Sequence, residues 1–75
     1  MNLGVSNNTV RLETREAEVL YLIAAKFSNL RIGTELDVSG RTVGRWCISL
    51  YEKIGVTTRE EAIIKGKKFL GKHSN

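Results

Sequence analysis

The chain has 75 residues, enough for one small domain, and 41% of them are hydrophobic, as in ordinary soluble proteins. Its single cysteine excludes an internal disulfide, and its single histidine excludes a zinc finger with two cysteines and two histidines. No apolar run approaches the roughly 20 residues of a membrane-spanning helix, and the amino terminus lacks the apolar core of a signal peptide. We therefore expect a cytoplasmic domain that needs no membrane, metal or cofactor.

The net charge of +4 mildly favours polyanionic partners, and its distribution is uneven. Residues 1–61 contain eight basic and eight acidic residues, so their charges sum to zero. The excess comes from four lysines near the end of the chain: Lys65, Lys67, Lys68 and Lys72. This basic end is either a binding element or a solubilising tail.

The chain contains no proline, and its apolar residues recur at helical spacing, which predicts an all-α fold. Residues 1–11 begin with a stretch rich in Asn, Ser and Gly, which predicts a flexible arm. Thr14 is expected to cap a first helix over about 15–26, because acidic residues occupy its first turn.

Ser28 and Asn29 predict the start of a short second helix. In this helix Ile32 and Leu36 are four residues apart and face the core. Gly33 lies beside them, and its small size permits the close approach of a neighbouring helix.

A turn over residues 37–40 precedes a third helix, which Ser39 is placed to cap and which Gly55 ends. Its predicted core face consists of Val43, Cys47, Leu50 and Ile54, at spacings of four, three and four residues.

Thr57 or Thr58 begins a fourth helix, in which Gly66 is a weak point that costs about 1 kcal/mol relative to alanine. This helix has more apolar surface than a three-helix core needs, so we expect two copies of it to form a homodimer contact. The expected interface residues are Ala62, Ile63, Gly66, Phe69 and Leu70.

The segment 28–53 has the order of a helix-turn-helix: a short helix, a tight turn, and a longer helix able to lie in a DNA groove. Short sequence motifs within and around this segment add to the pattern. The chain contains LETREAEVL at 12–20, LIA at 22–24, SN at 28–29, VS at 38–39, TV at 42–43 and LYEKIGV at 50–56.

This series resembles the LuxR/GerE-type DNA-binding domains, in register over about residues 12–66. The resemblance implies a four-helix helix-turn-helix domain, placed here at 12–70 and followed by a basic tail at 71–75. It also implies that the third helix, about 39–54, enters the major groove, and that the last helix forms a dimer contact. Members are mostly bacterial transcription regulators, and this chain is expected to be a stand-alone form located at the nucleoid.

Helix amino ends attract phosphate through free N–H groups and a positive dipole end, and two such ends start at Ser28 and Ser39. Arg41 and Arg45 lie one turn apart on the third helix, and arginine can bind guanine in a bidentate manner. The expected DNA-binding residues are Ser28, Asn29, Arg31, Ser39, Arg41, Thr42, Gly44, Arg45, Ile48 and Lys53, with Arg31 and Lys53 as phosphate contacts.

The sequence also departs from the family pattern. Gly44 and Ile48 stand where basic residues are common, and Trp46 and Leu30 replace a usual His and Lys. Ile48 contacts either thymine methyl groups or a protein, whereas Trp46 either packs on the first helix or joins an apolar surface. An alternative function therefore remains: a protein-binding adaptor or antagonist of another regulator or RNA polymerase, acting through Leu30, Trp46 and Ile48.

An enzyme is not expected, because the residues offer no catalytic triad and no paired carboxylates. Cys47 lies on the predicted core face, where we expect an inert buried thiol.

Overall fold

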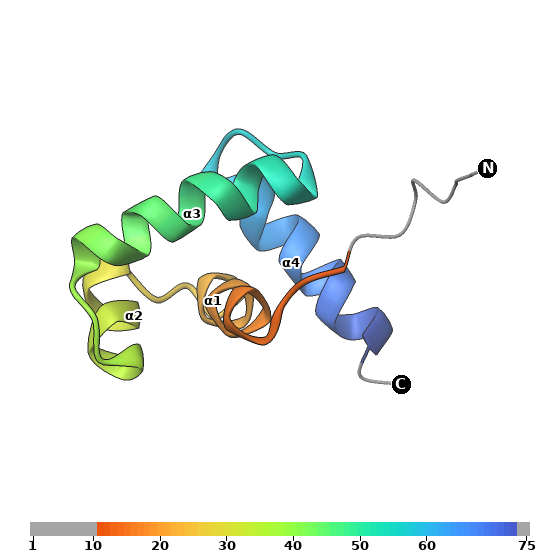
Figure 1. Cartoon of the computed structure of the whole chain (residues 1–75). Coiled ribbons are helices and arrows are strands. Elements are labelled where there is room, and N and C mark those ends of the chain that lie inside the picture. The colour runs from red at the N-terminus through yellow and green to blue at the C-terminus, as the bar shows by residue number, and fades with distance from the viewer. Residues whose placement is uncertain (1–10, 74–75) are drawn as a thin grey trace.

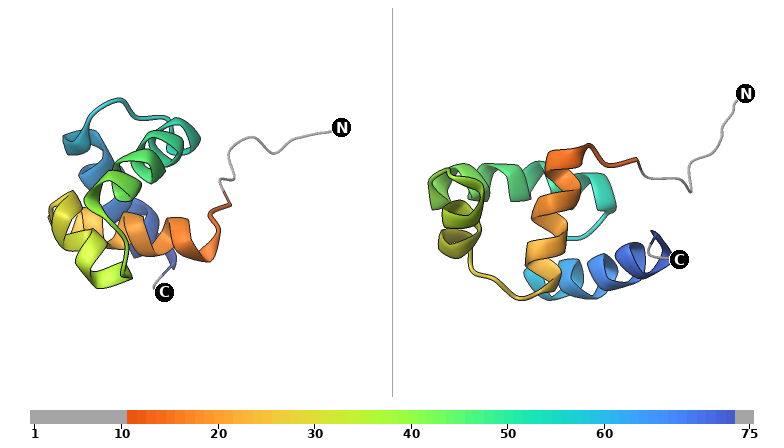
Figure 2. Two further views of the ribbon diagram at one scale, coloured as in Figure 1. Left: turned by 60° about the vertical axis from the view of Figure 1, so that its left-hand side comes forward. Right: turned by 90° about the horizontal axis from the view of Figure 1, so that it is seen from below.

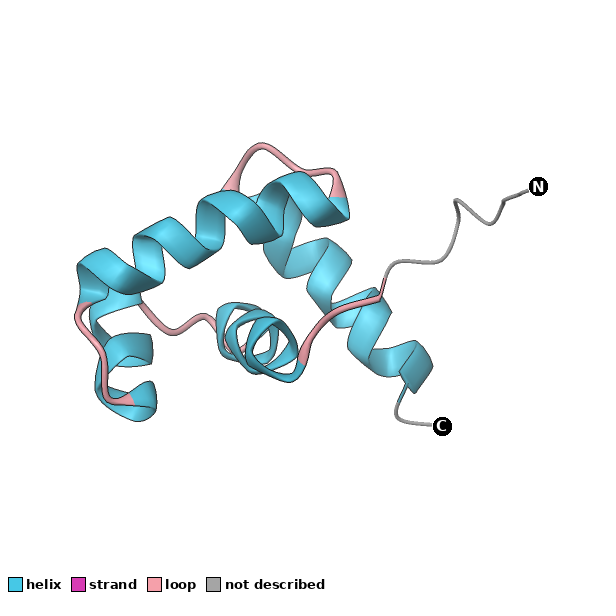
Figure 3. Ribbon diagram, in the orientation of Figure 1, coloured by secondary structure: helices cyan, strands magenta, loops and turns pink. Residues whose placement is uncertain are grey.

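The computed structural model describes the chain from Arg11 to His73, with side chains through Leu70. The predicted arm falls almost entirely outside the described residues. Four helices follow in chain order: α1 (Thr14–Ala24), α2 (Asn29–Leu36), α3 (Gly40–Ile54) and α4 (Arg59–His73) (Figure 1). The described residues form only helices and their connections (Figure 3), which confirms the all-α, four-helix prediction.

The helices pack as two pairs, α1 with α4 and α2 with α3. The long helix α3 joins the pairs: its first half lies against α2, and it then passes over α1, which is seen end-on in Figure 1. The second half of α4 points away from the α2–α3 pair (Figure 2). The helix-turn-helix therefore forms one end of the molecule.

The core lies where the helices meet. Val19, Leu20 and Ile23 of α1 are at most 1% exposed, and Ile32 of α2 is fully buried. The predicted face of α3 is buried along its length: Val43, Cys47, Leu50 and Ile54. Burial of each large aliphatic side chain stabilises the fold by about 1.5–3 kcal/mol. None of the described helices is long and apolar enough to span a membrane.

Two helix caps follow the prediction. The Ser28 hydroxyl accepts the backbone N–H of Arg31 at 3.1 Å, and the Ser39 hydroxyl accepts that of Thr42 at 3.1 Å. These bonds fix where α2 and α3 begin.

At the start of α4 the choice between two threonines is resolved. The Thr58 hydroxyl accepts the N–H of Glu61 at 3.1 Å, and Glu61 in return accepts the N–H groups of Thr58 and Thr57. This reciprocal capping lowers the pKa of Glu61, mainly through the bond from the Thr57 backbone.

The expected cap of the first helix is wrong. Thr14 is the first helical residue, and Glu13 occupies the capping position. The backbone N–H of Glu13 donates to Glu16 Oε1 at 2.8 Å, so an acid within the helix satisfies this end. The helix also ends at Ala24 instead of about residue 26, because Lys26 adopts a left-handed backbone with φ of 69°.

The carboxyl end of the fourth helix also differs from expectation. α4 continues to His73, three residues into the segment that the sequence predicted to be a tail.

Gly33 sits under the turn that joins α2 to α3. A Cβ at Gly33 would lie 2.5 Å from the Val38 carbonyl oxygen and 3.1 Å from the Ser39 carbonyl carbon. The close approach expected at this glycine is therefore real, but the neighbour is the backbone of the turn.

Candidate nucleic-acid interface

Helix α3 has two different faces. With its buried face turned to α1 and α2, the opposite side is exposed at Arg41, Arg45 and Ile48. Arg41 and Arg45 are four residues apart, so both guanidinium groups project from one side of the helix. The expectation that Arg41 and Arg45 lie one turn apart on the third helix is confirmed.

The amino ends of α2 and α3 lie against one another. A Cβ on Gly40 would lie 3.4 Å from Leu30 Cα and 3.6 Å from the Leu30 backbone nitrogen. Beside this contact, the Ser39 hydroxyl donates to the Thr42 hydroxyl oxygen at 3.1 Å. The first turns of the two helices therefore lie side by side, and the hydroxyl groups of Ser28, Ser39 and Thr42 are at these amino ends.

Asn29 is tied to the interior as well as to these amino ends. Its Oδ1 accepts a hydrogen bond from Arg59 Nη1 at 2.7 Å and lies 3.9 Å from Cys47 Sγ. Arg59 also donates to the carbonyl oxygen of Phe27. Sequence reasoning missed this role of Arg59. The available signal was a cation in the first turn of a helix, which the helix dipole disfavours unless it has a partner.

Cys47 and Tyr51 complete the polar cluster around Arg59. Burial raises the pKa of the Cys47 thiol, and the nearby positive charge of Arg59 only partly opposes this effect. Burial likewise raises the pKa of the Tyr51 phenol. Cys47 is 6% exposed, so the prediction of a buried thiol is confirmed. Among residues 11–70 no three His, Cys, Asp or Glu gather in a way that could hold a metal ion.

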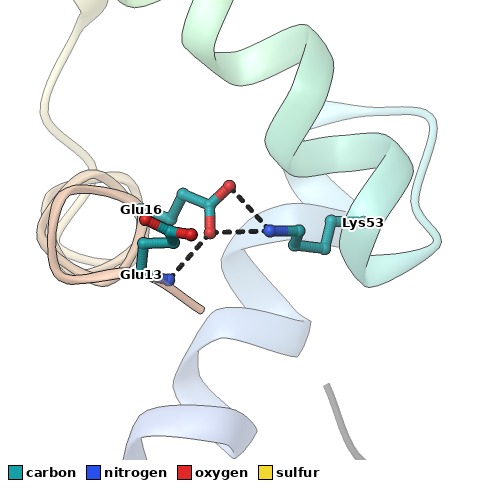
Figure 4. A network of polar contacts seen from close by, with 3 residues as sticks. All are labelled: Glu13, Glu16 and Lys53. Carbon is teal, nitrogen blue, oxygen red and sulfur yellow. Dashed lines mark hydrogen bonds and ion pairs between the residues drawn. The ribbon is translucent and has the colours of Figure 1, made fainter. Parts of the chain in front are cut away.

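The two expected phosphate contacts have partners within the domain. Lys53 Nζ lies 2.9 and 3.0 Å from the two carboxylate oxygens of Glu16, which joins α3 to α1 (Figure 4). The guanidinium of Arg31 stacks on the Phe27 ring, 4.1 Å from its centroid. A phosphate at Lys53 would compete with the Glu16 carboxylate, so Lys53 is a weaker candidate than the sequence indicated.

The residues that depart from the family pattern differ in their surroundings. Gly44 is open, because its nearest neighbour would be Asn29 Nδ2, 4.0 Å from an added Cβ. Leu30 and Ile48 are 74% and 68% exposed. Trp46 is half-buried against the core, and the Arg15 guanidinium carbon of α1 lies 4.8 Å from its ring centroid. Trp46 thus packs on α1, one of the two expected alternatives.

The expected dimer face needs correction at two residues. Ala62 is fully buried within the domain, and a Cβ on Gly66 would lie 2.9 Å from Leu20 Cδ1. These small residues let α4 approach α1 of the same chain and are not available to a second copy. Ile63 and Phe69 are partly buried and pack on the core, whereas Ile64 is 61% exposed.

Comparison with known proteins matches residues 11–65 to the family model described as bacterial regulatory proteins, luxR family. The chain is 42% identical over 62 residues to HTH-type transcriptional regulators MalT of Vibrio campbellii and Vibrio parahaemolyticus, and 40% identical to that of Yersinia pestis. Each alignment covers 83% of this chain but 7% of the relative. The comparison with solved structures returned no significant match. The family match covers most of the four-helix domain, and on this ground the chain belongs to the LuxR family of bacterial regulatory proteins.

Proposed function

We propose that this chain is a DNA-binding transcription regulator of the bacterial cytoplasm that inserts α3 into the major groove. The observation that carries the proposal is the two-faced character of α3. Its inner side is buried, and Arg41 and Arg45 project from its outer side at one end of the molecule. An α-helix fits the major groove, where arginine reads guanine O6 and N7.

The surrounding groups suit contacts to the DNA backbone. The amino ends of α2 and α3 adjoin, so backbone N–H groups and the Thr42 hydroxyl offer donors to phosphate oxygens. Such contacts set the position of α3 on the duplex and carry no sequence information themselves. We assign reading of the bases to Arg45, and positioning to Ser28, Ser39 and Thr42.

The MalT relatives are HTH-type transcriptional regulators, and this similarity supports the same function. These relatives are far longer than this chain, so the similarity reaches only the helix-turn-helix part.

We further propose that the domain acts as a homodimer through the exposed side of α4. Lys53 is already paired with Glu16, so a single domain has one cation fewer for DNA, and two linked half-sites raise the overall affinity. Ile64 is the exposed apolar residue on this helix that is best placed for such a contact. Sedimentation of Ile64→Asp tests this: a monomer where the parent is a dimer supports the proposal, and an unchanged dimer contradicts it.

The test of DNA binding compares Arg45→Ala with Lys67→Ala. Both variants lose one exposed cation, but Lys67 lies on the half of α4 that points away from the α2–α3 pair. Arg45→Ala should weaken binding to a cognate duplex by about 1–3 kcal/mol, as for loss of one good base contact. Lys67→Ala should weaken it much less. Equal effects of the two variants would show that α3 does not read the groove.

Exposed apolar side chains favour one alternative, a protein-binding adaptor or antagonist of another regulator or RNA polymerase. Leu30 and Ile48 are both more than two-thirds exposed, and Ile48 stands on the outer side of α3. In this alternative Ile48 is an anchor at a protein interface, where an unpaired ammonium would be costly. Ile48→Lys would then abolish capture of the partner while leaving the circular dichroism of the fold unchanged.

A further inference from the structure

Arg59 is the first residue of α4, and its guanidinium binds two residues where α2 begins. Nη1 donates to Asn29 in α2, and Nη2 donates to the Phe27 carbonyl just before that helix. The Asn29 oxygen also lies near Cys47 of α3. Because a cation is unfavourable at a helix amino end, Arg59 does little for α4 itself. Its contacts instead fix the start of α2 relative to α4.

The same contacts determine which way the Asn29 amide faces. A guanidinium is only a donor, so Asn29 must turn its oxygen toward Arg59. The Cys47 thiol approaches that oxygen as a second donor. The amide nitrogen therefore points the other way, and lies 4.0 Å from the position that a Cβ on Gly44 would occupy. Gly44 has no side chain that would cover it.

We propose that Arg59 is a positioning residue for DNA binding, which holds Asn29 so that its amide N–H groups face a phosphate of the DNA backbone beside Gly44. This inference rests on the proposed function and deepens it. Gly44 supplies no cation at this edge of α3, and Asn29 supplies a neutral donor in its place. A donor of fixed direction binds phosphate better than a freely rotating one, because less order is lost on binding.

Asn29→Asp separates this role from a structural one. The carboxylate keeps an oxygen for Arg59, so stability in urea should be equal to that of the parent or higher. The outward group becomes an acceptor, so affinity for duplex DNA should fall tenfold or more, roughly the effect of losing a hydrogen bond to a charged group. Thr34→Asp adds the same charge at an exposed site of α2 and should cause a smaller loss. Equal losses would mean that charge alone acts, and would overturn the proposal.

Nuclear magnetic resonance of the side-chain amide tests the positioning itself. The amide signals of Asn29, assigned by their loss in Asn29→Asp, should shift when the parent protein is saturated with duplex DNA. In Arg59→Gln this shift should shrink, because glutamine can donate or accept and no longer fixes the amide direction. An Asn29 amide that does not respond to DNA in the parent, or responds equally in Arg59→Gln, would contradict the inference.

Arg45→Ala in the same assays distinguishes failure of the proposed DNA-binding function from failure of the positioning role of Arg59. A parent protein that binds no duplex DNA would overturn the proposed function and the positioning role together. A parent that binds, is weakened by Arg45→Ala and is unaffected by Asn29→Asp would leave the proposed function intact and show that the role of Arg59 is wrong.

Discussion

Lys53 of α3 binds both carboxylate oxygens of Glu16 in α1, at 2.9 and 3.0 Å, and the same carboxylate accepts the backbone N–H of Glu13. One acid thus closes the amino end of α1 and links it to the carboxyl end of α3 (Figure 4). The bond from Glu13 is the main cause of a lowered pKa at Glu16, and the contact with Lys53 adds to it.

This pair predicts a loss of stability in acid. Because the pKa of Glu16 is lower in the folded state, its contribution is present above the ordinary pKa of 4.5 and is lost as pH falls through the folded value. Glu16→Gln should therefore unfold more easily than the parent near neutral pH and lose less stability on acidification. Urea midpoints at several pH values measure both effects, and parallel curves for the two proteins would contradict the assignment.

Replacing Lys26 with glycine is expected to raise the stability of the domain. Its backbone φ is 69°, a left-handed conformation that a side chain disfavours and glycine adopts freely. Lys26→Gly should stabilise the domain by about 1 kcal/mol. Ala25→Gly is the matched control, because Ala25 has φ of −81° and gains nothing from glycine. Thermal or urea unfolding gives both values, and equal changes would refute the explanation.

Two glycines of the helix-turn-helix should respond in opposite ways to alanine. A methyl group at Gly33 would collide with the Val38 carbonyl oxygen, a backbone atom that cannot move away without distorting the turn. Gly33→Ala should destabilise by about 1–3 kcal/mol or more. At Gly44 the space is open, and alanine should stabilise α3 by up to about 1 kcal/mol. If Gly33→Ala leaves the stability unchanged, the turn is less closely packed around Gly33 than these distances indicate.

The sequence predicted those features that depend on neighbours along the chain. Ser28 and Ser39 cap helices because their hydroxyls reach N–H groups three residues away, and the face of α3 follows from helical spacing. The partner of Arg59 could not be predicted, because Asn29 is 30 residues distant along the chain. Gly66 shows what a sequence pattern cannot predict. A small residue in a helix permits close packing, but only the fold determines that its neighbour is Leu20.

Removal of the Thr42 hydroxyl is expected to weaken DNA binding to the same extent for every DNA sequence. Its hydroxyl lies at the joined amino ends of α2 and α3, where we expect a phosphate contact. Thr42→Ala should therefore weaken binding to cognate and unrelated duplexes by the same factor. Thr34→Ala removes another exposed hydroxyl, which bonds to the Leu30 carbonyl, and should leave affinity unchanged. Weakening confined to one base position of the cognate site would contradict the phosphate role.

The central claim is that the outer side of α3 meets DNA, and the salt dependence of duplex binding by Ile48→Lys tests it most directly. Ile48 is 68% exposed on that side, so a lysine there can reach a phosphate without disturbing the core. Affinity should rise, and the slope of log K against log salt should steepen by about one unit relative to the parent. An affinity and slope equal to those of the parent, or no binding by either protein at low salt, would contradict the account.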